Sequence, residues 1–152
     1  MVIRKPVAQV FEAFLNPATI TQFWLSRSSG RLETGKQVQW SWDTYDISFP
    51  VTATTIELNR RIVLRWPGVN ETTTVTLTFA PQSDSTTFVE IAESGFSGGG
   101  DELVHQLANS VEGFALVLAS LKALLEHRTV LTAVADRYPK GIDRRAHLRR
   151  WR

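Results

Sequence analysis

The fold is decided by residues 101–125, which read DELVHQLANSVEGFALVLASLKALL. Apolar side chains recur in this stretch at steps of three and four, the spacing of one face of an α-helix. They are Val104, Leu107, Val111, Phe114, Leu118, Leu121 and Leu125. The pattern predicts a helix about 40 Å long, with Asp101 as its N-cap. A helix with one apolar stripe has to pack on another apolar surface, which the preceding residues must supply.

The segment from Gly30 to Phe96 alternates between apolar and polar side chains, which predicts antiparallel strands with one covered and one exposed face. The alternating apolar positions include Val38, Trp40 and Trp42, then Ile62, Leu64 and Trp66, then Val75, Leu77 and Phe79. The parity slips near Thr54-Thr55, where we expect a β-bulge that bends the strand. The prediction is an α+β fold, a curved antiparallel sheet of about six or seven strands wrapped around the long C-terminal helix.

Two short helices are predicted near the N-terminus. The first starts after Pro6, and Asn16-Pro17 ends it, because a residue before proline avoids helical geometry. The second covers Ala18 to Phe23. Only Val2 to Arg4 precede them, so the first strand is nearly absent, and that sheet edge is either open or covered in another way. Thr129 to Tyr138 is expected to add a helical turn or two, which completes a single domain over residues 1–139.

Composition and charge narrow the class of protein. The chain has 152 residues and no cysteine, which excludes disulfides and thiolate metal sites and suits a reducing cytoplasm. The N-terminus has no apolar run long enough for a signal peptide or membrane span. Residues 140–152 hold six basic and one acidic residue, which leaves 11 basic and 14 acidic residues in 1–139. We therefore expect a flexible basic tail and no nucleic-acid surface on the body.

This order of elements resembles the START-like superfamily, also called SRPBCC, whose domains have the helix-grip fold. Particular stretches resemble its branch homologous to the activator of the heat-shock protein 90 ATPase. They are Val10-Phe11-Glu12-Ala13-Phe14 with Asn16-Pro17 and Phe23-Trp24, the segments 56–66 and 87–96, and Gly113-Phe114, where the branch has Gly-Trp. The resemblance covers residues 7–138. In eukaryotic members of this branch the domain contacts the chaperone, whereas many small stand-alone members resemble carriers or have no assigned activity. A cavity between sheet and helix is expected because a curved sheet and one helix seldom fill the space between them.

The candidate ligand site is a set of inward aromatic side chains. They are Trp40, Trp42, Phe49, Trp66 and Phe79 on the strands, Phe23 and Trp24 near the short helices, and Phe114 on the long helix. Such rings either line a pocket for a flat apolar molecule or fill an ordinary core.

Glu93 is the polar candidate, because it shares the inward parity of Val89 and Ile91. A buried carboxylate needs a partner. Glu93 is expected either to anchor a ligand amine or hydroxyl, or to act as a general base. The alternative is a pair with Arg65 or a place at the wet mouth of the sheet. Asp43, Tyr45 and Asp46 either rim the same opening or form a solvated turn.

No motif predicts a catalytic residue, a cofactor or a metal. His105, His127 and His147 lack the spacing of metal ligands, and no nucleophile elbow is visible.

Three hypotheses follow. The first is a binding or carrier domain for a small hydrophobic molecule. The second is a co-chaperone-like interaction module, and the third is a cyclase or dehydratase that uses the carboxylate of Glu93. A homodimer is also expected, because an incomplete first strand leaves a sheet edge to cover.

Overall fold

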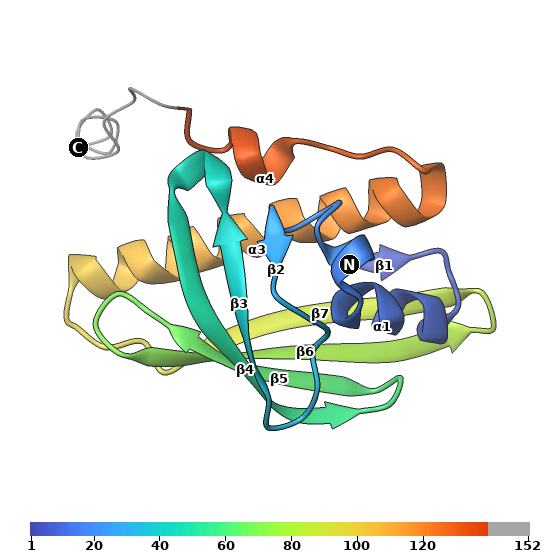
Figure 1. The fold of residues 1–152 in the computed structure, drawn as a ribbon, viewed down its shortest axis with the longest axis horizontal. Coiled ribbons are helices and arrows are strands. Elements are labelled where there is room, and N and C mark those ends of the chain that lie inside the picture. Colours follow the sequence, from blue (N-terminus) through green and yellow to red (C-terminus); the bar gives the residue numbers. More distant parts are fainter. Residues whose placement is uncertain (140–152) are drawn as a thin grey trace.

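The computed structural model describes residues 1–139 (Figure 1), and the predicted basic tail at 140–152 lies outside the described residues. Its centre is one antiparallel sheet of seven strands in the order β1-β7-β6-β5-β4-β3-β2. The strands are β1 (Val2–Ile3), β2 (Arg27–Ser28), β3 (Gln37–Trp42), β4 (Ile47–Glu57), β5 (Arg61–Pro67), β6 (Thr72–Ser83) and β7 (Thr86–Ser94). The helix-grip prediction is confirmed, since this curved sheet wraps around a long helix.

The predicted bulge in β4 is present. Ala53 pairs with Leu64 and Thr55 with Val63, so Thr54 is the extra residue. On the two sides of the bulge, Ala53 is fully buried and Ile56 is partly buried against the core. The bulge thus keeps the apolar side chains of both halves of a long strand on the concave face while the strand bends.

The long helix α3 (Asp101–His127) lies across the concave face of the sheet (Figure 1). Its second half packs into the core through Phe114, Val117, Leu118, Ser120 and Leu121, which are buried. By length and composition α3 is also apolar enough to cross a membrane, a criterion that core helices of folded domains meet as well.

The first half of the predicted stripe does not pack on the sheet. Val104, Leu107 and Val111 are 62%, 43% and 70% exposed. The first half of α3 turns another side, with Gln106 and Ser110, toward the sheet, where a cavity separates the two. The prediction that one stripe packs along the whole helix is therefore wrong for these turns.

The N-cap prediction is also wrong by one residue. The residue that precedes α3 is Gly100, whose φ of 55° favours glycine. Asp101 lies instead in the first helical turn together with Glu102. Both carboxylates are there close to the positive end of the helix dipole.

Two short helices cover one end of the concave face. In α1 (Val7–Leu15), Phe11 and Phe14 meet Phe79 edge to face, with ring centroids 5.1 and 5.5 Å apart. The second helix, α2 (Pro17–Ile20), is shorter than predicted. It is capped by the side chain of Asn16, which accepts a hydrogen bond from the Ala18 N–H at 2.9 Å. This end of the sheet is therefore filled by core packing.

The first strand exists but is short. β1 pairs with β7 through Val2 opposite Phe88 and Ile3 opposite Thr87, and the Val89 N–H donates to Met1 O at 2.8 Å. Beyond Val89, no strand among residues 1–139 pairs with this side of β7. The edge of β7 is thus partly covered. It is neither fully open nor fully paired, the two alternatives being an open edge and a covered one.

Candidate functional site

A cavity of about 400 Å³ separates the first half of α3 from the concave face of the sheet. Strands β3, β4 and β5, helix α3 and the turn that follows α2 bring aromatic rings to it. These rings are Trp24, Trp42, Phe49, Trp66 and Phe114. The polar side chains that line it are Glu93 on β7, Gln106, Asn109 and Ser110 on α3, and, at the end opposite Glu93, Tyr45, Arg137 and Tyr138.

The aromatic wall is rigidly packed. Trp66 and Phe114 stack with an interplanar angle of 9° and centroids 6.0 Å apart, and Trp24 meets both rings edge to face at 6.0 Å. The indole N–H of Trp42 donates to Trp24 O at 2.9 Å, and its ring lies 5.1 Å from that of Phe49. Each ring is therefore held in place by its neighbours.

Six of the nine candidate residues lie on the cavity wall, namely Trp24, Trp42, Phe49, Trp66, Glu93 and Phe114. The other three are in the packed core, where Trp40, Phe79 and Phe23 are 1%, 3% and 3% exposed. Phe23 and Phe79 both pack edge to face on Phe14 of α1, and Trp40 packs on Trp24. All nine side chains lie on the concave side of the sheet, but helices α1 and α2 fill only one end of that side.

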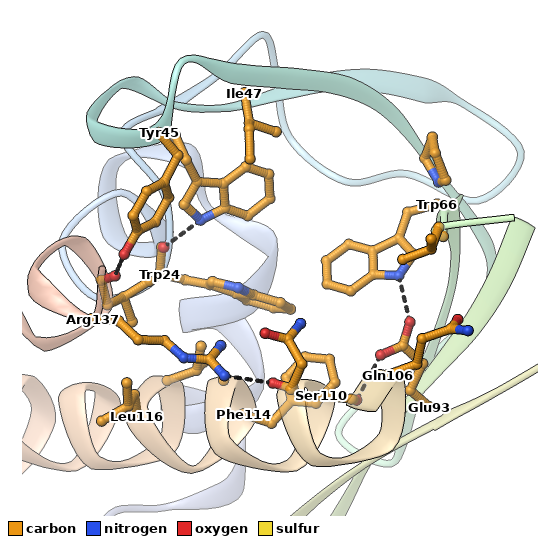
Figure 2. Close-up of a pocket in the computed structure, with 18 of the residues that line it drawn as sticks. Trp24, Tyr45, Ile47, Trp66, Glu93, Gln106, Ser110, Phe114, Leu116 and Arg137 are labelled. Carbon is orange, nitrogen blue, oxygen red and sulfur yellow. Dashed lines mark hydrogen bonds between the residues drawn. The ribbon is translucent and has the colours of Figure 1, made fainter. Parts of the chain in front are cut away.

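Glu93 accepts three hydrogen bonds at one end of the cavity, and Figure 2 shows those from Trp66 and Ser110. Its Oε1 accepts from the indole N–H of Trp66 at 3.0 Å and from the hydroxyl of Thr73 at 2.5 Å. Its Oε2 accepts from the hydroxyl of Ser110 at 2.6 Å. Arg65, the alternative partner, is exposed, and no ion pair within residues 1–139 includes Glu93. The carboxylate is held in place by neutral donors.

A short helix, α4 (Ala133–Asp136), lines the cavity through Val134, as the sequence predicted a helical turn for the region before Pro139. Tyr45, in the 3₁₀ helix η1 (Asp43–Tyr45), donates its hydroxyl to Val134 O, and the same hydroxyl lies 3.2 Å from Ala135 O. Tyr45 thus lies on the rim of the cavity, as one alternative proposed. Asp43 instead forms an ion pair with Arg27 at 2.8 Å.

Arg137, next to α4, completes the closure. Its guanidinium donates to Asn109 O at 2.9 Å and to the carboxylate of Glu112 at 2.8 Å. A Cβ at position 113 would lie 2.8 Å from Arg137 Nη1, so Gly113 provides the space for the guanidinium to pass over α3. Packing against Arg137 therefore explains why the Gly113-Phe114 pair has a glycine at position 113.

Sequence reasoning missed several lining residues of the cavity, and also Thr73, the buried hydroxyl that donates to Glu93. Thr73 shares the inward parity of Val75 and Leu77, which was a usable signal. Gln106, Ser110, Gly113 and Val117 follow helical spacing along one face of α3, beside the apolar stripe. Arg137 had no sequence signal, because its place depends on how the chain returns across the cavity.

The described residues hold no group of three or more metal-ligating side chains. His105 and His127 lie at different ends of α3, and His147 is outside the described residues.

Comparisons with known proteins agree with the fold. The family model described as Activator of Hsp90 ATPase homolog 1-like protein matches residues 4–126. Protein SSP2350 from Staphylococcus saprophyticus is 30% identical, with a TM-score of 0.72 over 86% of this chain and 92% of that chain. The Aha1 dimer from Colwellia psychrerythraea is 18% identical, with a TM-score of 0.68 over 84% of this chain and 92% of that one.

A third solved structure is DynU16, a protein in the dynemicin biosynthetic locus. It is 22% identical and has a TM-score of 0.69 over 86% of this chain, which spans only 46% of DynU16. Matches this distant describe the shared fold alone. No curated protein matches the chain.

Proposed function

Because the chain belongs to the family of activator of Hsp90 ATPase homolog 1-like proteins, a branch of helix-grip domains, we propose that it binds a small hydrophobic molecule between the sheet and α3. The observation that carries the proposal is the aromatic cavity of about 400 Å³. Protein interiors are normally packed without such space, and pockets of about 300–1,000 Å³ with apolar walls and few polar groups are typical of ligand sites. Residues 1–139 are the proposed binding domain, and a reducing cytoplasm is its proposed location.

Binding fits the cavity better than catalysis. Glu93 is the one carboxylate among the described residues that line it. A cyclase or dehydratase would need a second group to give or take a proton beside it. Arg137, the basic residue of the lining, is bound to Glu112.

The proposal is tested with N-phenyl-1-naphthylamine, an uncharged apolar probe whose emission rises in a dry site. We expect the wild-type protein to bind it, and Gln106→Trp to weaken binding by about tenfold or more, because the indole would occupy the cavity that Gln106 lines. Gln82→Trp is the matched control, since Gln82 is exposed and does not line the cavity. Equal binding by both variants, or no binding by the wild type, would contradict the proposal.

A second function, self-association, is favoured by the exposed first half of the α3 stripe. Val104, Leu107 and Val111 form this exposed stripe, on the helix that packs beside β1 and β7. Exposed apolar side chains gathered on one helix face are typical of a protein contact. We propose a second copy of the chain as the occupant, because β7, which α3 contacts, is an incompletely paired strand. A chaperone is the alternative partner.

A further inference from the structure

The cavity contains one charge that no other described residue neutralises, the carboxylate of Glu93. This inference rests on the proposed function and concerns the same cavity. We propose that the ligand is an apolar amine, whose protonated nitrogen binds Glu93 while its hydrocarbon part lies among the aromatic rings.

Each of the three groups that contact Glu93 can donate a hydrogen bond to its carboxylate. The indole N–H of Trp66 can only donate, and the hydroxyls of Thr73 and Ser110 lie 2.5 and 2.6 Å from the two carboxylate oxygens. Short O–H···O contacts of this kind are typical of hydroxyls that donate to a carboxylate. Neutral donors orient the charge, but they do not compensate it.

Burial makes the missing counter-charge important. Glu93 is half-buried beneath α3, and a carboxylate away from bulk water gains much from a cation. No lysine, arginine or histidine of residues 1–139 forms an ion pair with it. A ligand that brings an ammonium group would supply the missing charge.

The opposite end of the cavity does not attract an anion strongly. Figure 2 shows Arg137 and Tyr45 at one end and Glu93 and Ser110 at the other. Arg137 is paired with Glu112 at 2.8 Å, so its charge is already compensated. Its Nε–H is buried without an acceptor among the described residues, which suits a neutral ether or carbonyl oxygen at the far end of the ligand.

The aromatic wall adds to the preference for a cation. Trp66 touches Glu93 through its N–H, and Phe114 stacks on Trp66. Aromatic faces attract a cation that lies within about 6 Å of a ring centroid. Rings and carboxylate together therefore favour an ammonium group over a hydroxyl or a carboxylate of the same shape.

Three probes of one shape test the ligand class: 4-phenylbutylamine, 4-phenylbutanol and 4-phenylbutyrate. Each competes with N-phenyl-1-naphthylamine for the full-length protein at neutral pH. We expect the amine to bind at least about tenfold more tightly than the alcohol, because a hydrogen bond between two charged groups is stronger than one with a neutral partner. The carboxylate should be the weakest.

Glu93→Gln then tests whether the preference for the amine arises at Glu93, because the amide keeps the size of the side chain and removes its charge. The ratio of amine to alcohol affinity should fall toward one in this variant. In the control Glu90→Gln, at an exposed position of β7, the ratio should stay at its wild-type value. Circular dichroism verifies that both variants are folded.

The outcomes separate the two proposals. Equal binding of the three probes, or an amine preference that survives Glu93→Gln, would overturn the amine proposal while leaving the cavity as an apolar binding site. If neither the fluorescent probe nor any of the three compounds binds the wild-type protein, both proposals fail.

Discussion

Glu126 joins the N-terminal strand to the long helix. Its side chain, 9% exposed, accepts a hydrogen bond from the Arg4 backbone N–H at 2.7 Å and another from the ammonium of Lys122 at 2.5 Å. Lys122 also donates to Val2 O at 2.9 Å. Burial would raise the pKa of Glu126, but the hydrogen bonds from Lys122 and Arg4 and the positive charges of these two residues hold the pKa below its usual value of 4.5.

At the scale of this residue, we predict that Glu126→Gln lowers the free energy of unfolding by about 1–3 kcal/mol at neutral pH, because a buried charged acceptor is lost. A carboxyl group with a lowered folded-state pKa stabilises the fold above its unfolded-state pKa, and this contribution disappears as the pH falls through the folded value. The difference between wild type and variant should therefore be full above pH 4.5 and shrink at lower pH. Urea unfolding at about pH 7 and about pH 3 measures it.

Glu33→Gln is the control for that measurement. Glu33 pairs with Lys36 at 2.9 Å, but both side chains are more than half exposed, and exposed pairs contribute little. We expect no clear change in stability. A loss for Glu126→Gln that is the same at both pH values would contradict the role of its charge.

At the scale of the element, α3 consists of two halves with one sequence pattern and two environments. Leu121 is fully buried, whereas Leu107 is 43% exposed. We predict that Leu121→Ala lowers the free energy of unfolding by about 2–5 kcal/mol, because it leaves a cavity in the core. Leu107→Ala should stay within about 0.5 kcal/mol. Chemical denaturation of both variants at low protein concentration compares them, and similar losses would show that the first half of α3 is packed after all.

The sequence predicted the elements well, because alternation and helical spacing report which side of an element is apolar. The strands, the bulge at Thr54 and the long helix follow from that pattern. The pattern does not report which neighbour covers the apolar side. Val111 and Leu118 therefore looked equivalent, although only Leu118 is buried.

The same reason limits the prediction of the site. Strand parity places Trp40, Trp66 and Glu93 on the inside. It cannot separate core from cavity, because that depends on where α1 and α2 lie over the sheet. Trp40 accordingly packs in the core while Trp66 faces the cavity. Arg137 enters the site through a long-range return of the chain, which no local pattern encodes.

At the scale of the whole molecule, the exposed stripe predicts a dimer that one substitution weakens. Val111 is 70% exposed, and Val111→Asp would place a charge in the proposed contact, which is costly to bury. We expect sedimentation velocity over a range of concentrations to show dimer formation by the wild type and at least about tenfold weaker association of the variant.

His105→Asp is the matched control, because it adds the same side chain to an exposed position of α3 that points away from the stripe. It should associate like the wild type. A wild-type protein that remains monomeric at every concentration would exclude self-association through this face.

The contact between Tyr45 and α4 affects how fast a ligand can exchange. The two partners, Tyr45 and Val134, are 89 positions apart in the chain, yet they meet directly at the end of the cavity opposite Glu93. A contact that is the same in the empty and the filled protein leaves the equilibrium constant unchanged. If it must break before a molecule passes, it slows arrival and departure by one common factor. The residence time of a ligand would then depend on the hydroxyl of Tyr45, although this hydroxyl need not touch the ligand.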